Sequence, residues 1–204
     1  MALGGNTNSG PLFILKPVER DSNKNKVPPH FSITEKVNGK WSLSDRQVTR
    51  VTGELFDVRI KEQEYKDEKY NTVSLFLKDG EETYLLDLRF NLPSRSLFNS
   101  IASLERFDDL AITVYQNKSG YMAFGLWQGK EMVKWKYSLQ DLPTPEAVMF
   151  KGKEMHDYTS VDNFFVEVLK EISGKLGQKT KDSQPANQEP DGGQPDGSDE
   201  DVPF

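Results

Sequence analysis

Cationic and aromatic side chains are interleaved through the middle of this chain, and that combination suits one kind of chemistry. Lysine and arginine can neutralise phosphates, and aromatic rings can stack on nucleic-acid bases, whose π-faces are available whatever the base sequence. Together they predict a surface for single-stranded DNA. The residues we place on it are Arg59, Lys61, Tyr70, Phe76, Lys78, Arg89, Tyr115, Lys118, Tyr121, Trp127 and Lys134.

The same residue types also have a structural use. A small β-barrel needs large side chains in its interior, so roughly half of the aromatics in this region are expected to pack the core. A lone lysine is usually a solvated surface residue. The hypothesis therefore concerns the set as a whole.

Residues suited to catalysis are few. The chain has two histidines, His30 and His156, far apart in sequence, and it has no cysteine. It shows no metal-spaced ligand cluster, no nucleophile motif and no glycine-rich phosphate loop. We therefore expect a protein that is not an enzyme and needs no cofactor or metal. Scattered carboxylates leave a Mg²⁺-dependent nuclease as an alternative.

The C-terminal segment combines acidic charge with an apolar end. Residues 178–204 carry seven acids against two lysines, a net charge of −5, and their only aliphatic or aromatic residues are Ala186, Val202 and Phe204. Such a composition predicts disorder, because it buries too little apolar surface to offset the ordering entropy. A solubilising tail would explain the acids but not the terminal Val-Pro-Phe. We predict a partner-binding tip formed by Asp199, Glu200, Asp201, Val202, Pro203 and Phe204.

This terminus, Asp-Glu-Asp-Val-Pro-Phe, resembles the C-terminal tip of bacterial and bacteriophage single-stranded DNA-binding proteins. Those proteins typically end in several acids, an aliphatic residue, Pro and Phe after a Gly/Gln/Pro-rich linker. The resemblance implies an oligonucleotide-binding (OB) barrel that holds single-stranded DNA. It also implies a tip that recruits replication and recombination proteins such as a polymerase, a helicase or primase, or a nuclease.

The body of the chain alternates apolar and polar residues in a way that predicts strands. Phe56, Val58 and Ile60 are expected to face inward from one of them, and residues 19–29 are expected to form a loop. The predicted strands are 11–16, 30–37, 40–43, 51–61, 71–78, 83–91, 110–115, 121–128 and 132–138. Helices are predicted from Pro93 or Ser94, and from Thr159 or Ser160 to about Gly174.

The order of three strands, a helix and further strands is the OB topology. We predict a mainly β protein with a five-stranded Greek-key barrel at 49–140. It follows an N-terminal β extension at 1–48 that contains a hairpin. The connector and amphipathic helix at 141–177 precede the disordered acidic tail at 178–204. The apolar stripe of that helix is expected to pack on the barrel in preference to forming a dimer seam.

Charge and composition limit the possible partners. Without the tail, 24 basic residues face 25 acidic ones, so DNA binding requires a local basic face. No stretch is apolar enough to span a membrane, and we expect a cytoplasmic protein of a bacterial or phage-infected cell. The segments flanking the predicted barrel favour a divergent bacteriophage type, either monomer or homodimer. The predicted function is to coat and protect single-stranded DNA during replication, recombination and repair. The alternative is a small-barrel adaptor of the replication machinery that does not bind DNA.

Overall fold

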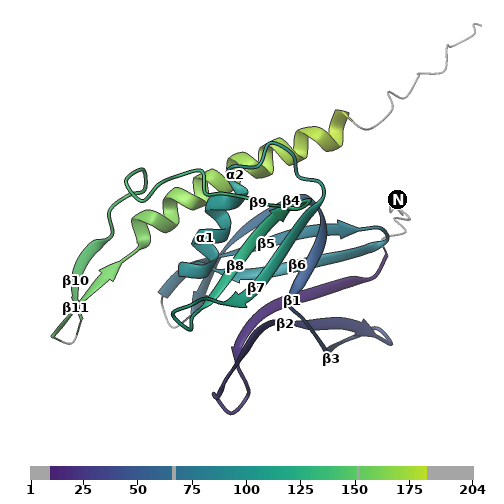
Figure 1. Cartoon of the computed structure of the whole chain (residues 1–204), viewed down its shortest axis with the longest axis horizontal. Helices are drawn as coiled ribbons and strands as arrows, with labels where there is room; N and C mark the ends of the chain where they lie inside the picture. The colour runs from purple at the N-terminus through teal and green to yellow at the C-terminus, as the bar shows by residue number, and fades with distance from the viewer. Residues whose placement is uncertain (1–9, 66–67, 151, 183–204) are drawn as a thin grey trace, which may run out of the picture.

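The protein is mainly β, with one curled nine-stranded sheet, two helices and a separate two-stranded hairpin (Figure 1). The computed structural model describes residues 10–65, 68–150 and 152–182. The strands of the large sheet are β1 (Leu12–Arg20), β2 (Lys26–Val37), β3 (Lys40–Val48), β4 (Arg50–Tyr65), β5 (Glu68–Asp79), β6 (Glu82–Arg89), β7 (Leu110–Gln116), β8 (Met122–Gln128) and β9 (Glu131–Met132). The other elements are α1 (Leu92–Ile101), α2 (Thr159–Asp182) and the hairpin strands β10 (Glu146–Phe150) and β11 (Lys153–Asp157).

The strand order of the sheet is β3-β2-β1-β6-β5-β4-β7-β8-β9. All neighbours are antiparallel except β1 and β6, which are parallel, so the sheet is mixed. Strand β4 is shared: residues 50–53 pair with β7, and residues from 54 onward pair with β5. Gly53 lies at this change of partner with a φ of 144°, and a Cβ there would lie 2.6 Å from the Lys78 carbonyl oxygen. A glycine is therefore required where the two strands diverge.

A bulge in β4 changes which residues face the core. Leu55 pairs with Leu77 and Asp57 with Phe76, so Phe56 is the extra residue. Leu55 is buried, whereas Phe56 is exposed and contacts the outward-facing ring of Phe76 with centroids 6.0 Å apart. The prediction that Phe56 faces inward is wrong, because the bulge shifts the alternation by one residue. Val58 is buried and Ile60 partly buried, as predicted.

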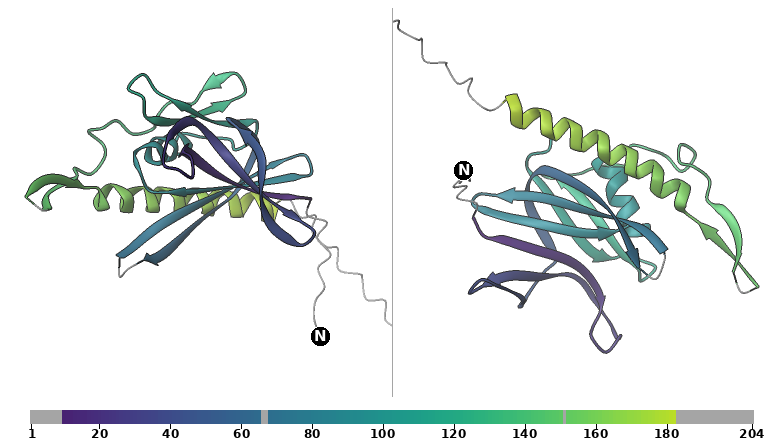
Figure 2. Two further views of the ribbon diagram at one scale, coloured as in Figure 1. Left: turned by 90° about the horizontal axis from the view of Figure 1, so that it is seen from below. Right: turned by 180° about the vertical axis from the view of Figure 1, so that it is seen from behind.

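The N-terminal strands belong to the same core as the rest of the sheet. Phe31 on β2 stacks on Phe124 of β8, with ring centroids 6.1 Å apart, although these strands are far apart in the strand order. The sheet therefore curls back on itself, and β1 and β2 lie along the curl (Figure 2). The hairpin predicted in the N-terminal extension is formed by β2 and β3. Its turn is at Asn38-Gly39, and both residues have positive φ as such turns require.

The predicted loop at 19–29 is mostly strand, so that prediction is wrong. The turn occupies only residues 21–25, where Asp21 Oδ1 accepts hydrogen bonds from the backbone N–H groups of Asn23 and Asn25. Pro28 and Pro29 lie within β2. On one side, the pairing of β2 with β3 begins only at residue 31. On the other side, the prolines lie at the irregularity in the β1–β2 pairing between Val18–His30 and Arg20–Lys26, so neither missing N–H breaks a regular ladder.

The last predicted strand, 132–138, is also wrong. Strand β9 ends at Met132, and after Val133 the chain follows α1 instead of β8. The side chain of buried Asn99 on α1 donates to the Tyr137 carbonyl oxygen and accepts from the Tyr137 N–H, both at 2.9 Å. The Val133 N–H still donates to the Leu126 carbonyl oxygen of β8 at 2.8 Å, whereas the Lys136 N–H and both backbone groups of Tyr137 bond to Asn99 of α1.

Helix α2 packs along the body with the predicted amphipathic stripe buried (Figures 1 and 2). Its buried residues are Val161, Phe165, Val166, Val168, Leu169, Ile172 and Leu176. The helix continues to Asp182, five residues into the range predicted as tail, and residues 183–204 with the predicted tip lie outside the described part of the chain. Within residues 10–65, 68–150 and 152–182, neither helix is long and apolar enough to cross a membrane.

Candidate nucleic-acid interface

Two neighbouring hollows lie beside α1, and together we call them the groove. They have volumes of about 940 and 380 Å³ and share Asn91 and Met122 in their walls. The larger hollow is lined by Glu19, Asn91, Leu92, Pro93, Ser96, Ser100, Tyr115, Asn117, Tyr121, Met122, Ala123, Phe124, Met132, Val133, Lys134 and Trp135. The smaller is lined by Lys16, Pro17, Gln63, Thr72, Asp87, Leu88, Arg89, Asn91, Ser94 and Met122.

Two aromatic residues of the groove come from the β7–β8 hairpin. Tyr115 and Tyr121 are 42% and 69% exposed, so much of each ring is open to a ligand. The turn between the strands is fixed by Asn117, whose Oδ1 accepts from the Ser119 and Tyr121 N–H groups at 3.0 and 2.9 Å. Lys26 of β2 donates to the Gly120 carbonyl oxygen and lies 5.9 Å from the Tyr121 ring centroid. These contacts fix the backbone of the turn that carries Tyr121.

The opposite wall of the larger hollow is formed by the irregular segment after β9. Lys134 and Trp135 are both exposed here. Ser103 Oγ donates to the Lys134 carbonyl oxygen at 2.8 Å, and the Lys136 N–H donates to the Asn99 carbonyl oxygen at 3.2 Å. The segment is therefore tied to α1 at several points, which positions a cation and an indole ring at the groove.

Arg89 is the main cation of the smaller hollow. Its guanidinium lies 5.6 Å from the Tyr70 ring centroid, and the Tyr70 hydroxyl donates to Gln63 Oε1 at 3.1 Å. Lys16 contributes a second cation, but its ammonium lies 3.9 Å from the Asp87 carboxylate. Exposed pairs of this kind are weak. A phosphate could therefore compete for Lys16.

Four of the predicted DNA-binding residues lie outside the two hollows, on the outward face of β4 and β5. They are Arg59, Lys61, Phe76 and Lys78. Arg59 lies 4.5 Å from the Phe76 ring centroid and donates to Asp57 Oδ2 at 2.7 Å. In the β5–β6 register Thr72 pairs with Arg89, and Phe76 lies on the same face of β5 as Thr72. The four residues therefore share a face of the sheet with Arg89, which lines the smaller hollow.

Two further predicted residues lie apart from the groove lining. Trp127 is partly buried on β8, and its Nε1–H donates to Thr113 Oγ1 at 3.4 Å across Gly125. Trp127 therefore has the packing role that was the alternative to base stacking for the aromatic residues. Lys118 is exposed on the β7–β8 turn, three residues before Tyr121.

The structure thus brings Tyr115, Tyr121, Lys134 and Arg89 into the walls of one groove, with Tyr70 in contact with Arg89. Sequence reasoning missed Lys16, Lys26 and Asn91. The contact between Lys26 and the Gly120 carbonyl joins residues 94 apart. No local pattern indicates such a contact, which follows from the sheet curling back on itself.

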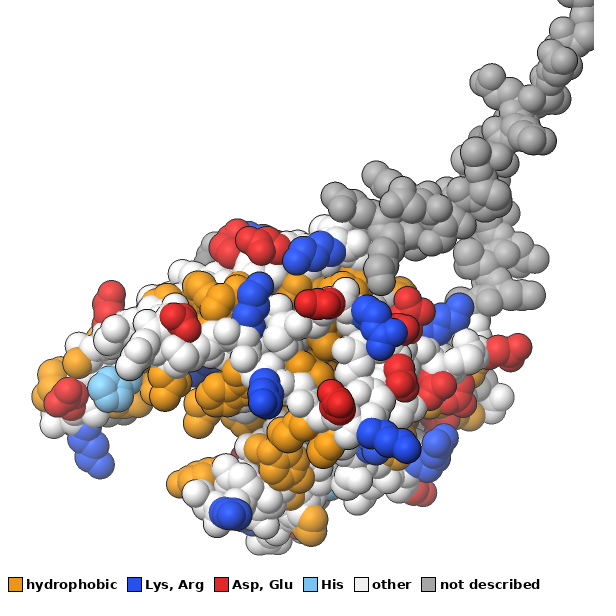
Figure 3. Space-filling model, turned by 45° about the horizontal axis from the view of Figure 1, so that its top comes forward, with side chains coloured by type: hydrophobic (Ala, Val, Ile, Leu, Met, Phe, Trp, Pro, Cys, Tyr) orange, Lys and Arg blue, Asp and Glu red, His pale blue; other side chains and the backbone are white. Residues whose placement is uncertain are grey.

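Groove electrostatics are mixed. Glu19 and Asp87 line the walls together with the cations. Positive and negative side chains are also interspersed on the face of the molecule seen in Figure 3. Affinity for a polyanion would therefore depend on the few groove cations and on stacking, not on a field of the whole molecule.

No cluster of three or more His, Cys, Asp or Glu suited to hold a metal ion occurs among the described residues. The chain matches no protein-family model, no curated protein and no solved structure.

Proposed function

We propose that this chain is a single-stranded DNA-binding protein that coats and protects single strands during DNA replication, recombination and repair. The observation that carries the proposal is the groove, in which the exposed rings of Tyr115, Tyr121 and Trp135 occur together with Lys134 and Arg89. The protein acts by binding and is not an enzyme.

Two kinds of side chain would bind the strand, aromatic rings and cations. Bases stack on Tyr115, Tyr121 and Trp135, which requires no reading of base edges and suits a protein that coats any sequence. Phosphates contact Arg89, Lys134 and Lys118. Arg59 and Phe76, on the outward face of β4 and β5, extend the path for a strand that leaves the groove at Arg89.

The finer fold assignment that fits this function is an OB barrel. Strands β4, β5 and β6, then α1, then β7 and β8 follow the order of an OB fold, in which the first strand is shared between the second and fourth. Strand β4 is shared in this way between β5 and β7. We propose that β1, parallel to β6, occupies the edge at which an OB barrel ordinarily closes. On this assignment, the smaller hollow on β5 and β6 and the β7–β8 turn would lie where OB folds hold single strands.

We further propose that the acidic tip, Asp199 to Phe204, recruits replication and recombination proteins. This rests on the resemblance of the terminal sequence to the tips of single-stranded DNA-binding proteins. A tethered polyanion should also compete with DNA for the groove cations. Deleting residues 199–204 should abolish partner binding while leaving DNA affinity unchanged or higher. A large loss of DNA affinity would contradict this division of roles.

The proposal is tested by fluorescence anisotropy of labelled oligo-dT and of a duplex, each titrated with the full chain at several salt concentrations. We expect preference for the single strand and a slope of log K against log salt of about −0.7 per neutralised phosphate. With Mg²⁺ added, the oligonucleotide should stay intact. Equal binding to both DNAs, or cleavage with Mg²⁺, would reject the assignment.

A protein-binding adaptor is the second candidate. The near-neutral body and the carboxylates of Glu19 and Asp87 in the groove favour it, because both oppose a polyanion. Absence of binding to either DNA at low salt, where electrostatic attraction is strongest, would favour this function.

A further inference from the structure

The β10–β11 hairpin projects from the body beyond the N-terminal end of α2 (Figures 1 and 2), and we call it the arm. It forms a sheet of its own with two strands. All residues of β11 and residues 146–149 of β10 are exposed. An isolated two-stranded hairpin is marginally stable in water, and its outer edges are open to further pairing. These features are typical of an element that is completed by a partner.

One face of the arm carries three kinds of side chain in order along its length. Glu146 pairs with Asp157 at the base, and Val148 pairs with Met155 in the middle. Alternate residues share a face, so Lys153 follows on the same side toward the tip. Phe150 pairs with Lys153 there, so it belongs to the same face. We call these six residues the arm stripe: from base to tip it has two acids, then Val148 and Met155, then Phe150 beside Lys153.

The arm stripe is unfavourable when uncovered. Two carboxylates directly opposite each other on neighbouring strands repel. Val148 and Met155 are 39% and 50% exposed, so the apolar middle is open to solvent. A partner that covers the stripe must supply cations at the base, apolar side chains in the middle and an acidic group at the tip.

A second arm stripe turned end for end meets this requirement. Its Lys153 reaches the Glu146 and Asp157 carboxylates of the first copy, and the reverse contact forms at the other end. The two Val148–Met155 pairs then meet in the middle. Such self-complementarity is the property of a two-fold interface, in which the same patch is used by both copies.

We propose that the arm is a self-association surface, through which two copies of this chain pair their arm stripes face to face and antiparallel about a two-fold axis at Val148 and Met155.

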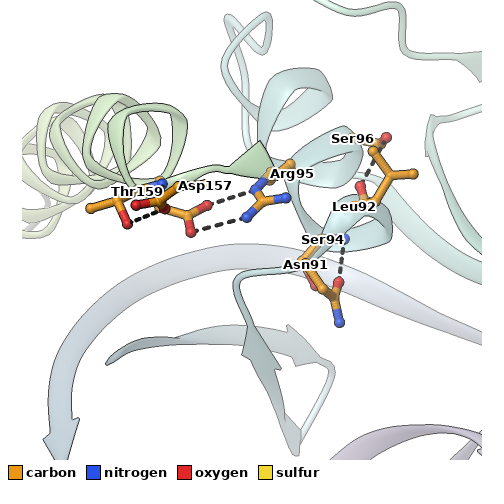
Figure 4. A network of polar contacts seen from close by, with 8 residues as sticks. Asn91, Leu92, Ser94, Arg95, Ser96, Asp157 and Thr159 are labelled. Atoms are coloured by element: carbon orange, nitrogen blue, oxygen red, sulfur yellow. Dashed lines mark hydrogen bonds and ion pairs between the residues drawn. The ribbon is translucent and has the colours of Figure 1, made fainter. Parts of the chain in front are cut away.

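The base of the arm is anchored, which suits this role. Asp157 Oδ1 accepts from the Thr159 N–H and hydroxyl at 2.9 and 2.6 Å, which ties β11 to the start of α2 (Figure 4). Arg95 of α1 donates to both oxygens of Asp162 at 2.6 and 3.0 Å and lies 4.5 Å from the Tyr158 ring centroid. The direction of the arm is therefore fixed before association, which reduces the entropy lost on pairing.

Cysteine cross-linking gives the sharpest test, because the natural chain contains no cysteine. In the full-length protein, Met155→Cys places a thiol next to the two-fold axis, and mild oxidation should give a disulfide-linked dimer. The matched control is Met149→Cys, on the opposite face of the same hairpin and 71% exposed. It should cross-link much more slowly. Equal cross-linking of both variants, or none of either, would overturn the proposal.

Charge reversal tests the ends of the stripe independently. Sedimentation of the full-length protein should show a concentration-dependent dimer, and Lys153→Glu should raise its dissociation constant by about tenfold or more through like-charge contact. Adding Glu146→Lys to Lys153→Glu should recover much of the loss. A protein that stays monomeric at all concentrations contradicts self-association, as does a dimer indifferent to Lys153→Glu; the arm would then serve a different partner.

Discussion

Tyr121 is the groove side chain whose ring is most open to a ligand, although its backbone is held by Asn117. A base stacked on it would bury apolar surface that is now in water. Trp41, an exposed aromatic on the edge strand β3, supplies a comparison, because it lies outside both hollows of the groove.

We expect Tyr121→Ala to lower affinity for oligo-dT by about 1–3 kcal/mol, the usual value of one base–aromatic stack. Fluorescence anisotropy with labelled oligo-dT measures the loss. The control Trp41→Ala should bind like the natural protein. Equal losses in both variants would place the DNA on another surface.

A second residue-scale prediction concerns the acid titration of Asp157. Hydrogen bonds from the Thr159 hydroxyl and N–H lower the pKa of this carboxyl below its ordinary value of 3.8. Because the folded pKa is the lower one, the stabilisation is fully present above pH 3.8 and is lost as the pH falls through the folded value. NMR titration of the Asp157 carboxyl should show this. Thr159→Val, which removes only the hydroxyl bond, should move the pKa toward 3.8, and an unchanged pKa would reject the stated cause.

Among the elements, α1 positions the groove wall that carries Lys134 and Trp135. Its Asn99 is 2% exposed and satisfies both backbone groups of Tyr137. Removing that side chain would leave the two backbone groups unpaired near the protein interior, which costs more than the loss of an exposed hydrogen bond.

Asn99→Ala should therefore lower the free energy of unfolding by about 1–3 kcal/mol, measured by urea denaturation. It should also weaken oligo-dT binding, because the wall formed by residues 133–138 loses its attachment. Gln140→Ala, an exposed substitution at the end of the same segment, should change neither quantity. A stable Asn99→Ala protein with unaltered DNA binding would show that this wall is not part of the site.

The strands also show which parts of the fold a local sequence pattern can predict. Alternation predicted strands at 71–78 and 83–91, where β5 and β6 occur, and Val73, Leu75 and Leu86 on these strands are fully buried. It failed at Phe56, because a bulge adds a residue without any change of composition. It failed at 134–138 because Asn99 of α1 bonds to the backbone in place of a neighbouring strand. Local periodicity does not indicate a partner from another element.

The residues of the candidate site could also be predicted only in part. Tyr115, Tyr121 and Lys134 lie near one another in sequence on β7, β8 and the following segment, so residue type and spacing were enough to select them. Lys16 lines the smaller hollow because β1 pairs with β6, whereas Lys26 contacts Gly120 only because the sheet curls back on itself. Trp127 is an aromatic residue on an alternating strand, so the sequence pattern alone does not distinguish it from a residue that stacks on a base. Its packing against Thr113 depends on the small Gly125 between them.

At the scale of the whole molecule, the two proposed functions would use separate parts of the chain. The groove is formed by α1 and strands of the curled sheet, whereas the arm stands apart at the N-terminal end of α2 (Figure 1). If both proposals hold, a dimer joined through its arms carries two grooves. Binding of one strand to both would then raise the apparent affinity without any new contact.

The central claim, that single-stranded DNA lies in the groove, is tested most directly by ultraviolet cross-linking of oligo-dT to the full-length protein, followed by mass spectrometry of the peptides. We predict cross-links at Tyr115, Tyr121 and Trp135, which unlabelled single strand suppresses and duplex does not. Cross-links confined to Trp41 or to the arm, in a protein that binds oligo-dT, would contradict the account.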